Sequence, residues 1–452
     1  MPQRAADMKL GNHIVLLLAL LLLVPQARAD VTVLLEEPYS YDGALVGTGH
    51  SAVYLTRVCA ASPTLLRRCE PGEPGVVLSR YHRLSEYDWI AIPLLPYLYA
   101  VDKPEDIPLF ADARIVASLR DHYRRNHLES IAPDEPSGAT PGGNWYELVG
   151  SAYDRTLYGF QIETSEQQDD NFIAAYNSRA NRENYKFLTS NCADFVREVV
   201  NFYYPKAVGR SWIADFGVAT PKHAAKSLVK YVKRHPELQF SSFIIPQVPG
   251  TIKRSTSIHG GVDSVFKAKK YEIPLLVFQP FVAGGFAVAY VAGGRFNPAK
   301  GAKVYDANGN LEQPLTAEER RSYEKGLEEL LRAEPGIVPG NARASWKEFA
   351  SSAQLRQDAF DGPVLLAESG DKVVAVGIAR GNVLNTPAPI ELIRNLLVAR
   401  LQEELRSKSS AKISDAQVRA DWQLLQAIIH ARSSELAARM ETVQRSGHNG
   451  TN

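Results

Sequence analysis

This sequence has few cysteines, almost no net charge and no recognisable nucleotide-binding motif. Only three of its 452 residues are cysteines, which excludes a small disulfide-rich scaffold. The formal net charge of +1 argues against nucleic acid or an anionic membrane surface as the main partner. There is no phosphate-binding loop, no dinucleotide fingerprint and no cluster with metal-ligand spacing. The sequence therefore implies no cofactor and no metal.

An almost unbroken apolar run stands near the N-terminus. Arg4 and Lys9 precede this run, Ile14 to Val24, and Ala27-Arg28-Ala29 fits a signal-peptidase site. The pattern predicts a signal peptide over residues 1–29. We therefore expect a periplasmic or secreted protein.

The length of the chain predicts more than one domain. After the signal peptide we expect a first domain over residues 30–240, a strand- and loop-rich region over 241–312, and a mainly helical module over 313–452. The chain contains both strand and helix patterns, and we expect the α+β class. The apolar stretch 275–294 is interrupted by Gln279, Pro280 and several glycines, so we interpret it as buried strands and turns rather than a transmembrane helix.

The cysteine count indicates one thiol without a partner. In an oxidising compartment, cysteines tend to pair, and an odd number leaves one over. Cys59 and Cys69 close a short loop that contains Pro63, and they are the natural disulfide pair. Cys192 is then a free thiol where free thiols are uncommon, and a chemical role would explain it.

Cys192 also stands at the predicted start of a helix. Asn191 is a strong N-cap residue, and Asp194 stands where a capping box needs it. Apolar residues then recur at helical spacing: Phe195, Val196, Val199, Val200 and Tyr203. The unpaired N–H groups and the dipole of a helix start favour a thiolate, so Cys192 is a candidate nucleophile. The alternative is that Cys192 is a small buried hydrophobic residue.

A nucleophilic cysteine needs a base within hydrogen-bond reach. His50 is the candidate because it begins a predicted strand. Gly49 precedes it, and a glycine there would let a substrate backbone come close. A lone histidine at a strand start can equally be structural.

Two segments resemble a known arrangement. Gly49 to Leu55, followed much later by Tyr185 to Cys192, resembles a circularly permuted papain-like fold, in which the histidine strand precedes the cysteine helix. The Asn-Cys-x-x-Phe-Val pattern resembles the lecithin:retinol acyltransferase group. The Tyr-x-Phe-Leu-Thr-x-Asn-Cys approach more closely resembles the N-terminal periplasmic domain of Lnb-type bacterial lipoprotein N-acyltransferases. The resemblance covers roughly residues 31 to 235.

This resemblance implies roles for individual residues. Cys192 would be the nucleophile and His50 the general base. A third polar residue would orient the base from the strand that follows the histidine strand. Ser79, His82 and Asp88 are candidates there, and His82 is preferred.

The implied activity is acyl transfer through a thioester on Cys192, with a lipoprotein or other lipid as substrate. The chain differs from Lnb-type enzymes because no clear transmembrane segment follows the catalytic region. Two alternatives therefore stay open. One is a cell-wall peptidase or amidase of NlpC type that acts on peptidoglycan peptides. The other is a catalytically inactive binding module.

Overall fold

The computed structural model describes about two thirds of the chain. The described residues are 29–39, 48–82, 86–108, 110–182, 185–186, 188–211, 215, 217–260, 281, 296–306, 311–333, 338–352, 354–358, 362–369, 372–377, 395, 399, 416–424 and 426. The predicted signal peptide, apart from Ala29, lies outside them, as does the apolar stretch 275–294 apart from Phe281. Among the described residues, no helix has both the length and the apolar character needed to cross a membrane.

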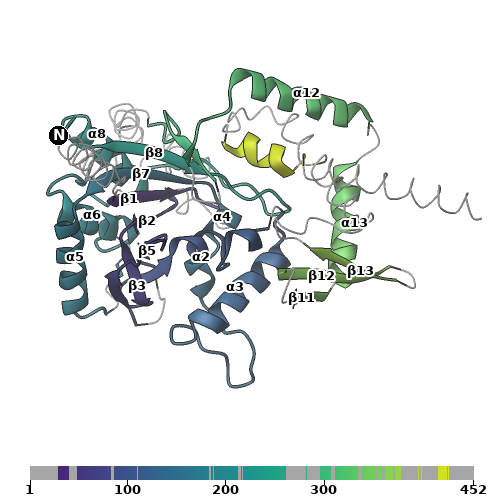
Figure 1. Ribbon diagram of the computed structural model, residues 1–452, viewed down its shortest axis with the longest axis horizontal. Helices are drawn as coiled ribbons and strands as arrows, with labels where there is room; N and C mark the ends of the chain where they lie inside the picture. Colours follow the sequence, from purple (N-terminus) through teal and green to yellow (C-terminus); the bar gives the residue numbers. More distant parts are fainter. Residues whose placement is uncertain are drawn as a thin grey trace, which may run out of the picture.

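An eight-stranded mixed sheet forms the centre of the molecule (Figure 1). The strand order is β10-β9-β8-β7-β1-β2-β5-β6. The bounds are β1 (Ala29–Glu36), β2 (His50–Leu55), β5 (Val76–Ser79), β6 (Ile90–Pro93), β7 (Leu157–Thr164), β8 (Phe240–Ile245), β9 (Lys303–Tyr305) and β10 (Leu311–Glu312). Neighbouring strands are antiparallel, except that β8 and β9 are parallel. The sheet and its helices give a mixed α+β fold, as predicted.

Helices cover both faces of this sheet. The helices α5 (Glu166–Ser178), α6 (Cys192–Tyr203) and α8 (Pro221–Val232) pack on one face, against side chains such as Val33 and Leu35. The helices α2 (Leu94–Tyr99), α3 (Ala113–His127) and α4 (Ser151–Asp154), with the 3-10 helix η3 (Trp145–Leu148), pack on the other. Leu34 belongs to this second core. Successive residues of β1 therefore point to opposite faces, as strand geometry requires.

A small hairpin stands beside the main sheet. It consists of β3 (Val58–Ser62) and β4 (Leu65–Arg68), and it carries the disulfide between Cys59 and Cys69 that the sequence predicts. Asn177 of α5 fastens the hairpin to the helical layer, since its side chain accepts from the Leu66 N–H at 3.0 Å and donates to the Leu66 carbonyl at 2.8 Å. Cys192 is left as the free cysteine.

The last third of the chain contains both helices and strands. The helices α12 (Ala317–Ala333) and α13 (Pro339–Ser352) precede a three-stranded sheet of β11 (Gln354–Asp358), β12 (Gly362–Ser369) and β13 (Lys372–Gly377). Ser369 of β12 pairs with Lys372 of β13, and the two strands are antiparallel. The indole of Trp346 on α13 donates a 3.0 Å hydrogen bond to Asp112, the N-cap of α3. This region is therefore docked on the sheet domain through a buried polar contact.

The region over 241–312 shares the main sheet. Residue 240 begins β8, which pairs with β7 along its length, and β9 and β10 extend the sheet further. The boundary predicted at residue 240 thus coincides with the first residue of a strand of the same sheet.

Candidate functional site

The first turn of α6 carries Cys192, and its capping box is complete. The Asn191 side-chain oxygen accepts from the N–H groups of Ala193 at 2.9 Å and Asp194 at 3.0 Å. The Asp194 carboxylate in turn accepts from the Asn191 N–H, and the guanidinium of Arg210 holds it at 3.1 Å. These contacts fix Cys192 as the first residue of the helix, as the sequence predicts.

The Cys192 thiol lies against the start of β2. The residue is partly exposed, while most of its neighbours on the buried face of α6 are fully enclosed. The backbone N–H and the hydroxyl of Ser51 lie beside the sulfur. Ser51 immediately follows His50, so the structure brings the proposed nucleophile next to the segment that carries the proposed base.

Burial, rather than the helix start, dominates the acidity of this thiol. Removal from water raises the pKa of Cys192, and the backbone N–H groups of Ser51 and Ala193 near the sulfur only partly oppose this rise. The expected stabilisation of the thiolate by the helix start is therefore present but outweighed. A thiol in this state is neutral near pH 7 and needs a base to become a nucleophile.

The sheet opens where Cys192 meets it. β2 pairs with β5 only through Val53, Tyr54 and Leu55. His50 and Ser51 lie beyond this ladder, although both remain paired with β1. The start of α6 lies at this opening, because its first residue contacts Ser51.

The His50 ring is fixed on one side and unpartnered on the other. It stacks on the Tyr81 ring with centroids 4.3 Å apart and planes 9° apart. Its buried Nε2 has no hydrogen-bond partner in the described part of the chain, so a bond from the Cys192 thiol to this nitrogen is not made in the structure. Burial, aided by the positive charge of Arg155, places the pKa of His50 well below its usual range. The imidazole is therefore neutral near pH 7 and able to accept a proton.

A buried carboxylate lies opposite His50. Glu36 is its direct cross-strand partner in the register of β1 and β2, and the side chain of Glu36 is fully buried. The Tyr97 hydroxyl donates to one carboxylate oxygen, and the Arg155 guanidinium lies 3.3 Å from the other. Burial raises the pKa of Glu36, while Arg155 and the Tyr97 hydrogen bond oppose the rise. The sequence analysis did not identify Glu36, because its role depends on strand register.

The three residues that the sequence offered as orienting groups contact side chains other than His50. His82 is exposed, and its ring contacts Tyr185 with centroids 4.9 Å apart. Asp88 pairs with Arg80 at 2.6 Å, and Ser79 is buried in β5 opposite Ile90 of β6. It is Tyr81, the neighbour of His82, that packs on His50.

The backbone of β1 explains why residue 49 is a glycine, whereas the sequence suggested the approach of a substrate backbone. Its φ is +69°, and a Cβ there would lie 2.0 Å from the Glu36 carbonyl oxygen. The close approach at this position is therefore made by β1 of the same chain, and it sets the turn that leads into His50.

Arg80 fastens the segment in front of Cys192. Its guanidinium is almost fully buried, donates to the Ser190 hydroxyl at 3.2 Å and lies 4.9 Å from the centre of the Phe195 ring. One side chain thus holds the end of β5, the residue before the helix cap and the first turn of α6 together.

Comparison of the chain with family models, curated proteins and solved structures gives no match.

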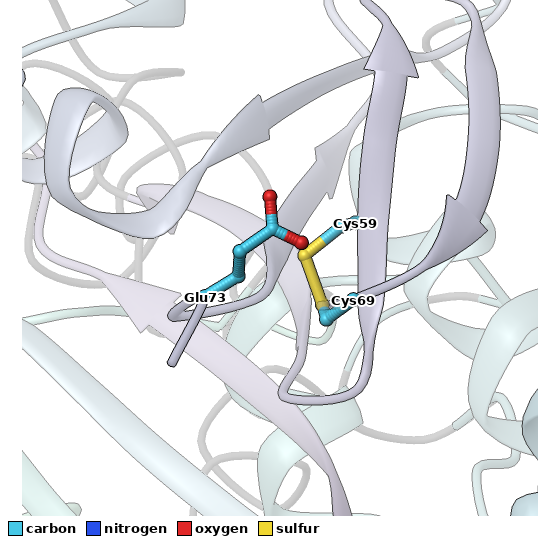
Figure 2. Close-up of side chains that lie close together, drawn as sticks. All are labelled: Cys59, Cys69 and Glu73. Carbon is cyan, nitrogen blue, oxygen red and sulfur yellow. A yellow bond between two sulfur atoms is a disulfide. The ribbon is translucent and has the colours of Figure 1, made fainter. Parts of the chain in front are cut away.

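One group of potential metal ligands occurs among the described residues, away from this site. Cys59, Cys69 and Glu73 have ligand atoms within 4.8 Å of one another. Figure 2 shows the two sulfur atoms joined in the disulfide, with the Glu73 carboxylate beside them. Arg67 binds both oxygens of Glu73 at 2.6 Å. These donors are thus already used by a disulfide and an ion pair.

Proposed function

We propose that this protein is an exported, cysteine-dependent acyl-transfer enzyme with a circularly permuted papain-like catalytic domain. The observation that carries the proposal is the position of Cys192. It is a free, half-buried cysteine at the first residue of a fully capped helix, in contact with Ser51, which follows His50. The order of histidine strand before cysteine helix supports the permuted arrangement.

The protonation states favour general-base catalysis over a preformed ion pair. The pKa of Cys192 is raised and that of His50 is lowered, so thiol and imidazole are both neutral in the resting site. Among the described residues His50 Nε2 has no hydrogen-bond partner, so it is available to accept the thiol proton. This step requires the thiol and the ring to close to hydrogen-bond distance, as catalytic pairs commonly do when substrate binds.

The reaction then proceeds in two halves. The Cys192 sulfur attacks the acyl carbonyl, and a carbon–sulfur bond forms as His50 takes the thiol proton. His50 returns that proton to the leaving alcohol or amine, which leaves a thioester. An incoming amine or water gives up a proton to His50, attacks the thioester and releases the thiol.

The backbone N–H groups near the Cys192 sulfur differ in whether they are available to donate to an oxyanion. Those of Ala193 and Asp194 are bound by the Asn191 cap. The Ser51 N–H lies beside the sulfur and so is placed to stabilise charge that develops on the substrate oxygen.

Acyl-enzyme formation tests this proposal directly. Wild type, Cys192→Ala and His50→Ala would be incubated with p-nitrophenyl acetate and with lipopeptide and muropeptide donors, and examined by intact mass. We expect an acyl adduct on wild type, none on Cys192→Ala and at least about a hundredfold slower formation on His50→Ala.

The products separate the substrate classes. Transfer to an amine from a lipid donor supports the acyltransferase, and cleavage of a muropeptide supports the peptidase or amidase. Equal modification of wild type and His50→Ala would contradict both and favour a catalytically inactive binding module.

A further inference from the structure

The proposed function leaves one part of the site unassigned, namely the residue that orients His50. Orientation matters because an imidazole can present either nitrogen, and a base needs the correct one toward the thiol. The strand register supplies a candidate that none of the sequence patterns indicated.

Glu36 is the group that shares a face with His50. Directly opposed residues of antiparallel strands have Cβ atoms about 4.5–5.5 Å apart on the same face of the sheet. The register pairs Glu36 with His50, whereas Leu35 pairs with Ser51 on the α6 face. The carboxylate and the imidazole therefore stand side by side beneath the open end of β2.

Three other side chains hold this pair. Tyr97 from α2 and Arg155, between α4 and β7, bind the two oxygens of Glu36. Tyr81 stacks on His50, donates to the Glu147 carbonyl at 2.9 Å and has its hydroxyl 3.5 Å from that of Tyr97. The support on the histidine and the support on the carboxylate thus belong to one buried cluster.

The charged and titratable groups around His50 and Glu36 come from several elements. They are Arg155, Tyr97, Tyr81, Tyr39, Glu147 from η3, Asp154 from α4 and Cys192 from α6. Among these, Arg155 disfavours a positive charge on His50, and Glu36 disfavours a negative charge on Cys192.

We propose that Glu36 is the positioning residue of the catalytic pair: held by Tyr97 and Arg155, it fixes the His50 ring and compensates the charge that His50 gains when it takes the Cys192 proton. This inference rests on the proposed function. A carboxylate placed in this way stabilises an imidazolium electrostatically, and its effect is strong because the site is shielded from water.

The substitution Glu36→Gln tests this role. It removes the negative charge and keeps the shape, so the pKa of His50 and that of Cys192 should both fall. The His50 titration would be read by NMR of ring-labelled protein, with His50→Ala for assignment. The Cys192 titration would be read from the pH dependence of its alkylation by iodoacetamide. We expect both midpoints at lower pH and acylation by p-nitrophenyl acetate slower by about tenfold or more.

Glu37 provides a matched control. It is the next residue, and its carboxylate accepts from Tyr158 at 2.8 Å and from Ser255 at 2.6 Å. Burial raises its pKa, as it does for Glu36. Glu37→Gln should leave both midpoints and the acylation rate unchanged, whereas a purely structural role for Glu36 would make the two variants behave alike.

Tyr97→Phe keeps the test decisive if Glu36→Gln does not fold. Loss of the hydroxyl raises the pKa of Glu36, so both midpoints should move in the same direction by a smaller amount. Unchanged midpoints and acylation rate in the folded variants would overturn the role of Glu36. If His50→Ala acylates as fast as wild type, the proposed function itself fails; if only His50→Ala is slow, the inference alone fails.

Discussion

The two faces of the sheet differ most sharply at adjacent residues of β1. Leu35 points toward α6 and belongs to an apolar core with Val33 and Val53. Glu36, the next residue, points the other way into a cluster with His50 and Arg155. One strand thus contributes stability on one face and a polar site on the other, because its side chains alternate.

The Glu36 cluster is held by an ion pair and a hydrogen bond, although the core around it on this face is apolar and includes Leu34. Removing a carboxylate and a guanidinium from water is costly, and their attraction and hydrogen bonds offset much of this cost. Such a cluster fixes geometry more than it adds stability. This comparison predicts that substitutions on the apolar face change the free energy of unfolding, while those on the polar face change the reactivity of Cys192.

The largest loss of stability is expected on the apolar face. Leu55 of β2 is 1% exposed within the core against α6. Leu55→Ala should lower the free energy of unfolding by about 2–5 kcal/mol, since it leaves a cavity. Urea denaturation would measure this, with Leu65→Ala as control. Leu65 is 46% exposed, and its truncation should cost no more than about 0.5 kcal/mol. Similar losses for both would refute the assignment of the core.

The Asn191 cap stabilises α6 and also positions Cys192. Its loss should therefore change both the free energy of unfolding and the reactivity of the thiol. Asn191→Ala removes the acceptor for two N–H groups and should cost about 1 kcal/mol. It should also slow alkylation of Cys192, because the cap fixes the thiol against Ser51. Ser165→Ala is the matched control, since Ser165 caps α5 with an equally complete capping box. Its cost should be similar and its alkylation rate that of wild type. Equal alkylation in both variants would contradict a positioning role for the Asn191 cap.

The smallest effect is expected at the disulfide hairpin. Arg67 lowers the pKa of Glu73 to about 2, against an ordinary value of 4.5. A lowered pKa in the folded state stabilises the fold above the ordinary value and loses this contribution as pH falls toward about 2. Both side chains are about one-third exposed, so solvent screening limits the contribution to about 0.5 kcal/mol. Glu73→Gln should remove this part of the acid dependence of stability, and an unchanged pH profile would contradict it.

Local patterns in the sequence identified what local chemistry determines. The start of α6 follows from the capping preferences of Asn191 and Asp194. The start of α8 follows from Thr220 and Pro221 in the same way. The disulfide follows from the number and spacing of the cysteines.

Groups that depend on strand register were not predictable from the sequence. The pairing of Glu36 with His50 depends on the register of β1 against β2, and the stacking of Tyr81 on His50 depends on where β5 ends. The resemblance implied an orienting residue after the histidine strand, and His82 was preferred. The residue that contacts His50 in the structure is Tyr81, one position earlier. In an extended chain, one position changes which face a side chain occupies.

The central claim is that His50 activates Cys192, and the rate of Cys192 alkylation tests it most directly. Cys59 and Cys69 are joined in a disulfide and Cys192 is free, so iodoacetamide reacts with the Cys192 thiol alone. We predict that His50→Ala, near neutral pH and with its fold verified by circular dichroism, reacts at least about tenfold more slowly than wild type. Equal rates in the two folded proteins would contradict the account.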